Sequence, residues 1–353
     1  MLLYGYRSIS LIFIQPSEMW IKLTKEQKVQ VLEQTGIAKG LPAFVIEKDW
    51  WVCILLKAIF QSKYAKSVIF KGGTSLSKAY HLIHRFSEDI DLVIDRHLLG
   101  FDELTSITQI KKLRKASGSF IINEFREELI HQLDQLGIDK AFYEIKYNDH
   151  VDDTSDPNTL GVYYQSVVPV SNAYVEQRVL LELGARSLTE PAETKSIISF
   201  IDENYKGLSF AEPAFEVQVV VPTRTFIEKV LLLHEEFSKP TDKIRTDRLT
   251  RHFYDLEKLM KAEYGLLALQ DEELFHAIVE HRKTVNPIRG LDYSNHKKGK
   301  IKILPPDEVR SKWEADYKTM QENMIVDESL DWKELLNRIQ EIENKWNEQG
   351  QNK

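Results

Sequence analysis

Two aspartates in one short stretch give the clearest sign of chemistry in the chain. Asp89 and Asp91 stand in the run Asp89-Ile90-Asp91-Leu92-Val93, where carboxylates and apolar residues alternate. Alternation with period two predicts a strand that turns one face to the core, so both carboxylates point to the same side. Hard oxygen ligands placed together suit Mg²⁺ or Mn²⁺ and leave positions for phosphate oxygens. We therefore expect Asp89 and Asp91 to hold a divalent metal ion.

A glycine pair, Gly72-Gly73, lies upstream of the aspartates and follows the short apolar run 68–70. Glycine lets the backbone turn sharply and approach a ligand closely. Apolar residues recur at helical spacing over 74–83, so the turn is predicted to open a helix. Free N–H groups at such a helix start attract anions, and the hydroxyl residues that follow add donors. This arrangement predicts a phosphate-binding turn.

The whole stretch resembles the DNA polymerase β superfamily of nucleotidyltransferases, whose signature is a Gly-Gly or Gly-Ser turn, a helix and an Asp-x-Asp strand. More narrowly, GGTSLSK followed by RFSEDIDL resembles the AbiEii/AbiGii group, the toxin half of type IV toxin–antitoxin systems. The alternative is a connection whose glycines only turn and whose aspartates face solvent. Clustered polar residues of this kind favour a ligand site.

A lone carboxylate, Glu182, stands among Leu180, Leu181 and Leu183 in a predicted strand. Burying a carboxylate is costly unless it is paired or bound to a metal. The superfamily uses a third carboxylate on a later strand, so the resemblance makes Glu182 the candidate third metal ligand. An outward-facing residue on an edge strand is the alternative.

A cation and a group of charged residues follow in the second half of the chain. Lys229 lies at the edge of an apolar stripe in the helix predicted from residue 223, where it either reaches solvent or binds a buried anion. Arg248, Arg251 and Asp255 have offsets of three and seven, which predicts one helical face. The arginines suit phosphate oxygens and Asp255 could orient them or hold Lys229. A surface ion-pair ladder worth little energy is the alternative.

The resemblance covers most of the chain from Met19 onward and implies roles for these residues. The group has an essential lysine after a glutamate, as Lys229 follows Glu228, and an RHxYDL pattern, with Phe253 in its variable place. The expected catalytic residues are Asp89, Asp91, Lys229 and Asp255, and the expected metal ligands are Asp89, Asp91 and Glu182. The expected nucleotide-binding residues are Gly72, Gly73, Thr74, Ser75, Lys78, Arg85, Ser87, Arg248 and Arg251.

The composition fits a globular protein built from two packed regions. The chain has 353 residues, of which 42% are hydrophobic and 29% charged, with a net charge of −7. This charge argues against a protein coated in basic surface but leaves room for a basic cleft. The single Cys53 excludes a disulfide framework and fits a reducing cytoplasm. We expect a cytoplasmic protein without a membrane partner, in which residues 1–18 are an upstream extension of the natural start.

The predicted elements indicate an α+β fold. Helices are predicted from a Thr24 cap to near Gly36, after Pro42 and over 104–136, and strands over 142–147, 161–170, 178–183 and 215–221. We expect a nucleotidyltransferase core with a mixed sheet over 19–222 and a mostly helical region over 223–353, with the active cleft between them. Glu47, Lys48 and Asp49 are expected as a solvated helix start or, for Lys48, as a contact to the nucleotide or the catalytic carboxylates.

The resemblance implies transfer of a nucleoside monophosphate from an NTP to an RNA acceptor, with the 3′ end of tRNA as the expected acceptor. It also implies a cognate antitoxin, acting by contact or indirectly. One alternative is a nucleotide-binding module without transferase chemistry. Another is a nucleotidyltransferase that modifies a small molecule such as an aminoglycoside.

Overall fold

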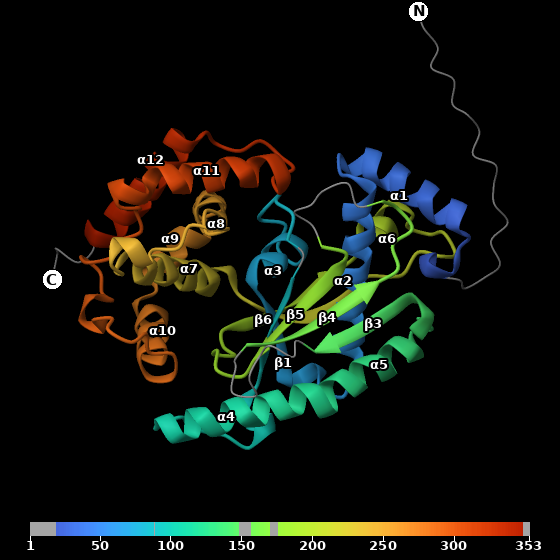
Figure 1. Ribbon diagram of the computed structural model, residues 1–353, viewed down its shortest axis with the longest axis horizontal. Helices are drawn as coiled ribbons and strands as arrows, with labels where there is room; N and C mark the ends of the chain where they lie inside the picture. The colour runs from blue at the N-terminus through green and yellow to red at the C-terminus, as the bar shows by residue number, and fades with distance from the viewer. Residues whose placement is uncertain (1–18, 88, 148–156, 170–175, 349–353) are drawn as a thin grey trace, which may run out of the picture.

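The protein is an α+β structure organised around a seven-stranded mixed sheet (Figure 1). The computed structural model describes residues 19–87, 89–147, 157–169 and 176–348. Strand order in the sheet is β3-β4-β5-β2-β1-β7-β6. The predicted fold class is therefore confirmed, whereas the extension predicted over 1–18 lies outside the described residues.

The elements alternate along the chain and become helical after the last strand. The strands are β1 (Val68–Lys71), β2 (Ile90–Ile94), β3 (Tyr143–Tyr147), β4 (Asn158–Tyr164), β5 (Arg178–Gly184), β6 (Ala192–Ile197) and β7 (Phe215–Val220). The helices are α1 (Lys25–Lys39), α2 (Ala43–Gln61), α3 (Gly72–Lys78), α4 (Ile107–Phe120), α5 (Arg126–Gln135), α6 (Phe200–Asn204), α7 (Pro222–Phe237), α8 (Arg251–Lys261), α9 (Tyr264–Gln270), α10 (Glu272–Val285), α11 (Asp307–Asn323) and α12 (Trp332–Glu348). None of the helices described is long and apolar enough to cross a bilayer.

The centre of the sheet brings segments that are distant in sequence into register. β2 pairs with β1 in antiparallel and with β5 in parallel orientation. Asp91 lies opposite Lys71 of β1 on one side and opposite Glu182 of β5 on the other. Residues that face each other across strands point to the same side of a sheet. Lys71, Asp91 and Glu182 therefore form one polar row.

The opposite face of the same strands forms the larger hydrophobic core. Phe70, Leu92 and Leu181, the neighbours of that polar row, are buried in a cluster with Trp50 and Trp51 of α2. α2 packs against β5, β7 and α5, so it closes this face of the sheet. Because strand side chains alternate, filling one face with apolar residues commits the polar row to the other face.

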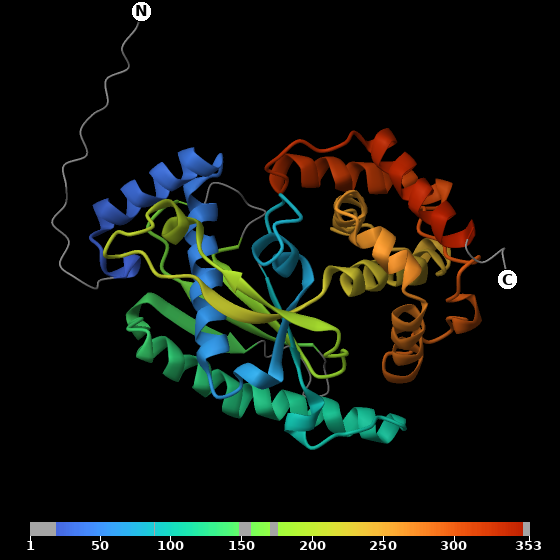
Figure 2. The same cartoon turned by 180° about the vertical axis from the view of Figure 1, so that it is seen from behind.

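Helices α7 to α12 form a second cluster beside the sheet (Figures 1 and 2). Phe226, Phe253 and Trp313 are buried there, together with Leu76 of α3 and the nearby Ile83. The chain enters this cluster at Pro222, the first residue of α7, beside the boundary predicted after residue 222. The glycine-turn helix α3 thus contributes to the core of the helical region.

The structure differs from the predicted elements at several places. The strand predicted over 161–170 is β4, which begins at Asn158 and ends at Tyr164. The helix predicted over 74–83 is α3, which ends at Lys78, and His81 then adopts a left-handed φ of 53°. The first helix runs past Gly36 to Lys39 and is capped by a left-handed Gly40. The edge strand β6 was not predicted because its sequence, AETKSI, is polar and pairs only with β7.

The charged trio at the start of α2 is buried, so the solvated interpretation is wrong. Glu47 accepts a hydrogen bond of 2.9 Å from the Val167 amide. Lys48 Nζ donates to the Glu176 carbonyl at 2.8 Å, and Asp49 forms an ion pair with Lys78. The trio ties α2 to neighbouring segments.

Candidate active site

A cavity of about 270 Å³ opens on the polar face of the sheet, between the glycine turn and helices α7, α8 and α10. Among the predicted residues, its walls contain Gly72, Gly73, Arg85, Ser87, Asp89, Asp91, Glu182, Lys229 and Arg251. The walls also contain Lys71, Thr225, Glu228, Leu232, His252 and Arg282, which the sequence did not single out as site residues. The fold thus gathers residues from six segments around one space.

Four carboxylates line this cavity: Glu228 of α7, and Asp89, Asp91 and Glu182 at the centre of the sheet. Asp91 and Glu182 are neighbours across the parallel strands β2 and β5, and Asp89 directly precedes β2. Burial raises the pKa of Glu182 to about 7, and the nearby charges of Asp91 and Asp89 add to the shift. Within the described residues, no group of three or more His, Cys, Asp or Glu side chains is arranged to hold a metal ion as it stands. The carboxylates face one cavity without forming a closed ligand set.

The glycine turn is packed against the carboxylates so closely that no side chain fits. Gly72 has a φ of +79°, and a Cβ there would lie 1.9 Å from Oδ2 of Asp91. A Cβ on Gly73 would lie 2.5 Å from the Arg85 guanidinium and 2.9 Å from the Ser87 hydroxyl. Glycine is therefore favoured at position 72 by both its backbone conformation and the lack of space, and at position 73 by the lack of space alone.

Asp255 joins two cations at the base of the cavity. Arg85 donates to both oxygens of the buried Asp255 carboxylate, at 2.7 and 2.8 Å. Lys229 Nζ lies 2.8 Å from Asp255 Oδ2. Burial opposes ionisation of Asp255, but Arg85 and Lys229 hold its pKa well below the usual range. Asp255 thus fixes two cations that come from different segments of the chain.

The surroundings of Lys229 also affect its own charge. Burial lowers the pKa of Lys229, although the Asp255 charge opposes this shift. His252 Nδ1 lies 3.4 Å from Lys229 Nζ, and burial together with the Lys229 and Arg251 charges lowers the pKa of His252 well below its ordinary value. His252 is therefore neutral near pH 7 and can act as an acceptor beside the ammonium group.

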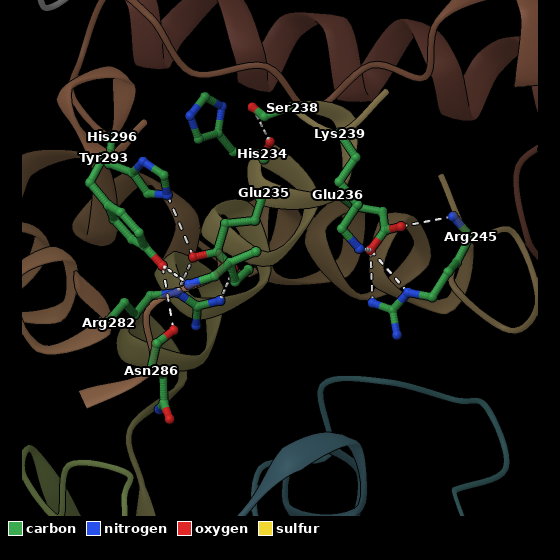
Figure 3. Close-up of polar contacts among 11 residues, drawn as sticks. His234, Glu235, Glu236, Ser238, Lys239, Arg245, Arg282, Asn286, Tyr293 and His296 are labelled. Carbon is green, nitrogen blue, oxygen red and sulfur yellow. Dashed lines mark hydrogen bonds and ion pairs between the residues drawn. The ribbon is translucent and has the colours of Figure 1, made fainter. Parts of the chain in front are cut away.

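Two arginines complete the cationic wall. Arg251, the first residue of α8, makes no hydrogen bond or ion pair with any part of the chain that the structure describes, which leaves its guanidinium available to an anion. Arg282 of α10 is held by Glu235 of α7, with one hydrogen bond of 2.8 Å from Nε and a second from the terminal nitrogen (Figure 3). No local sequence pattern marks Arg282 as a site residue, because its position depends on how α10 packs on α7.

Four predicted nucleotide-binding residues do not line this cavity. The Thr74 hydroxyl hydrogen-bonds the Asp89 carbonyl at 2.5 Å, and the Ser75 hydroxyl donates to the Gly72 carbonyl at 2.8 Å. Lys78 lies in an ion pair with Asp49 at 2.7 Å and lines a separate cavity. The Thr74 and Ser75 hydroxyls hold the turn and the strand in place, since short hydroxyl side chains readily bond to nearby backbone.

Arg248 is the fourth of these residues, and the prediction that it shares a helical face with Arg251 is wrong. Arg248 has a φ of 58° and precedes α8, which begins at Arg251. Its amide donates to Asp316 of α11 at 2.7 Å, and the same carboxylate accepts from the Thr250 amide at 3.1 Å. Asp316 therefore supports the turn before the helix, and only Arg251 reaches the cavity.

Comparison with known proteins identifies the family of this chain. No curated protein matches the chain. Among solved structures, MenT4, a nucleotidyltransferase toxin from Mycobacterium tuberculosis H37Rv, aligns over 92% of this chain and 98% of its own, with 16% identity and a TM-score of 0.40. A family model described as "Nucleotidyl transferase AbiEii toxin, Type IV TA system" matches residues 54–338, a span that contains the whole cavity. The chain therefore belongs to the AbiEii family of nucleotidyltransferase toxins of type IV toxin–antitoxin systems.

Proposed function

We propose that this nucleotidyltransferase moves a nucleoside monophosphate from an NTP to a hydroxyl of RNA, the 3′ end of tRNA, and releases pyrophosphate. The observation that carries the proposal is the meeting of the Asp91–Glu182 pair with a cationic cavity that contains Lys229 and Arg251. Blocking tRNA 3′ ends would stop protein synthesis, which accounts for toxicity. A cognate antitoxin, acting by contact or indirectly, is the proposed partner, and the cytoplasm is the proposed location.

The carboxylates Asp89, Asp91 and Glu182 are the residues that would hold Mg²⁺. Their fit is supported by the register that places Asp91 opposite Glu182, and by the pKa of Glu182, which burial and then the charges of Asp91 and Asp89 raise to about 7. Carboxylate oxygens are the ligands that Mg²⁺ prefers. When bound, the ion lowers the pKa of the acceptor hydroxyl and neutralises charge on the leaving phosphates.

The chain's own cations would bind and orient the triphosphate. Gly72 and Gly73 bring the backbone to the edge of the carboxylates, where a bulkier residue would collide with Asp91. Arg251 offers a planar fork to phosphate oxygens. Asp255 keeps Lys229 charged and fixed, so the ammonium is in place before substrate arrives. Preorganised cations of this kind stabilise the charge that develops during phosphoryl transfer.

The test is incorporation of labelled NTP into tRNA, measured together with pyrophosphate release and growth arrest. Asp91→Ala and Asp91→Asn should abolish all three, because either change removes a charge that no neighbouring residue replaces. Asp102→Asn is the matched control, since the Asp102 side chain is 92% exposed. Undiminished incorporation in the Asp91 variants would remove Asp91 from the mechanism.

The same assay separates the alternatives. NTP binding without pyrophosphate release, in the presence of total cellular RNA, would indicate a binding module rather than a transferase. Pyrophosphate release that needs a small molecule but no RNA would indicate that the acceptor is a small molecule. Sequencing RNA 3′ termini from cells that express the protein then identifies the acceptor and the added nucleotide.

A further inference from the structure

A second, smaller cavity of about 150 Å³ lies on the other flank of the carboxylate pair. Asp91, Glu182 and Lys71 line both cavities, so the polar row of the sheet separates them. The walls found only in the smaller cavity include Arg186, Ser187 and Asn286. The proposed reaction centre is therefore reached from two sides.

The smaller cavity is built by hydrogen bonds between distant segments. Lys71 Nζ lies 3.2 Å from the Ser187 hydroxyl, and the Arg186 guanidinium donates to the Asn286 side chain. The Arg186 carbonyl is bonded to the His281 ring at 2.6 Å. These contacts fasten the segment after β5 to α10. The cationic groups of the cavity are thus held in position.

Helix α10 contributes to both cavities. Arg282 of α10 lines the larger cavity, and Asn286, which directly follows the last residue of α10, lines the smaller one. Glu235 fixes Arg282, so the same helix orients a residue on each side of the carboxylate pair. Movement of α10 would disturb both cavities together.

The chemistry of phosphoryl transfer requires two approaches. The entering oxygen and the leaving oxygen lie roughly in line on opposite sides of the transferred phosphorus. A triphosphate in the larger cavity leaves the other side of the carboxylate pair for the acceptor. At about 150 Å³ the smaller cavity is below the usual range of roughly 300–1,000 Å³ for pockets that enclose a drug-sized ligand. It suits one phosphate group and the edge of its sugar.

We propose that the smaller cavity binds the last phosphodiester of the acceptor RNA, with Arg186, Asn286 and Ser187 as its ligands. This inference rests on the proposed RNA nucleotidyltransferase activity and names the residues that hold the acceptor. An arginine fork, a side-chain amide and a hydroxyl are the groups that proteins use to grip a nucleic-acid phosphate without reading its sequence. Arg186 is therefore a substrate-binding residue that contacts the acceptor and not the reacting phosphorus.

The test compares Arg186→Gln with the matched variant Arg178→Gln, which changes the first residue of β5, whereas Arg186 follows the end of that strand. The readouts are KM for tRNA, KM for NTP, and tRNA affinity by fluorescence anisotropy over a range of salt concentrations without NTP. Arg186→Gln should raise KM for tRNA by roughly 10–100-fold and change KM for NTP less than about twofold. The slope of log affinity against log salt should fall by about one. Arg178→Gln should leave KM for tRNA, KM for NTP and tRNA affinity unchanged.

Two further variants keep the test decisive if Arg186→Gln is unstable. Arg186→Lys should restore part of the tRNA affinity, and Asn286→Asp should weaken tRNA binding by placing a negative charge near the phosphate. A raised KM for NTP with unchanged tRNA affinity would assign the cavity to the triphosphate and overturn the inference. Unchanged KM for NTP together with unchanged tRNA affinity would also overturn it. A wild-type protein that binds tRNA through Arg186 but releases no pyrophosphate would contradict the proposed activity and not the binding site.

Discussion

Asp91 of β2 and Glu182 of β5 lie directly opposite each other on neighbouring parallel strands, so the sheet itself fixes the spacing of two carboxylates from distant parts of the chain. Gly72 packs against the other side of Asp91, and this contact completes a rigid setting for the carboxylate. Site residues held by strands are positioned more accurately than residues held by loops. Changes that move either neighbour of Asp91 should therefore affect activity more than stability.

The first prediction concerns Gly72→Ala. A methyl group at this position would lie 1.9 Å from Asp91 Oδ2, in a residue with a φ of +79°, so the carboxylate must shift. We expect at least about a 100-fold loss of transferase activity, because misplacing a reacting group by 1 Å has effects of that size. The measurement is kcat/KM for labelled NTP incorporation, with urea unfolding in parallel.

Gly100→Ala is the matched control for that experiment. Gly100 has a φ of +80°, but a Cβ there would meet no atom within 4 Å. It should cost about 1 kcal/mol of stability through backbone strain alone and leave activity intact. If Gly72→Ala behaved like Gly100→Ala in both measurements, the contact with Asp91 would have no catalytic consequence.

The second prediction concerns the buried carboxylate that joins Arg85 and Lys229. Asp255→Asn leaves two largely buried cations without their shared charge partner. We expect a loss of about 3–5 kcal/mol in the free energy of unfolding. The exposed Asp242→Asn should change it by less than about 0.5 kcal/mol. Urea unfolding monitored by circular dichroism measures both variants.

A coupled variant tests the same network in another way. Lys229→Met in the Asp255→Asn background removes a buried ammonium that has lost its partner, so it should cost less stability there than in the wild-type protein. If the changes in the free energy of unfolding of the two single variants add up to that of the double variant, Lys229 and Asp255 do not interact energetically, despite their 2.8 Å separation.

The third prediction concerns pH and a pair of buried histidines (Figure 3). His234 stacks edge-on against His296 at 4.8 Å, accepts from the Lys302 amide, and neighbours Glu235. Burial, and then the His296 charge, lower the pKa of His234 to about 4. The unfolded chain therefore binds more protons between about pH 4 and 6.5, and the free energy of unfolding should rise with pH over that range.

His234→Asn should flatten part of that rise, because asparagine can still accept from the Lys302 amide but does not titrate. The effect is on the order of 3 kcal/mol at most, from the 1.36 kcal/mol that each pKa unit represents. His131→Asn, on the exposed side of α5, is the control and should leave the slope as it is in the wild-type protein. An equal slope in His234→Asn and wild type would show that His234 does not titrate across the transition.

The contiguous part of the site could be predicted from sequence, because local patterns determine it. The glycine turn and the alternation of Asp89 and Asp91 lie within one stretch. Glu182 could be recognised because it is a lone carboxylate among apolar residues of a predicted strand. In the structure, Asp91 and Glu182 lie opposite each other on neighbouring strands. Such features depend on residue type and period and not on the packing of distant helices.

The remaining residues depend on tertiary packing or on local competition for hydrogen bonds. Arg282 reaches the cavity only because α10 packs on α7 and Glu235 holds its guanidinium. Thr74 and Ser75 were expected to face a phosphate, but α3 is only seven residues long and both hydroxyls bond within the protein. Lys78 forms an ion pair with the buried carboxylate of Asp49, a contact that no sequence pattern predicted.

The last prediction separates the two cavities by kinetics. Arg251 lines the larger cavity and has no partner among the described residues, so its charge is available to the triphosphate. Arg251→Gln should raise KM for NTP by roughly 10–100-fold, since hydrogen bonds to charged groups contribute about 1.5–3 kcal/mol, and leave tRNA affinity unchanged. Stability should change little, because no hydrogen bond or ion pair within the described residues is lost, and the exposed Arg338→Gln is the matched control. Arg251→Gln and Arg186→Gln should therefore give opposite patterns of KM. A loss of tRNA affinity in Arg251→Gln would exchange the roles of the two cavities.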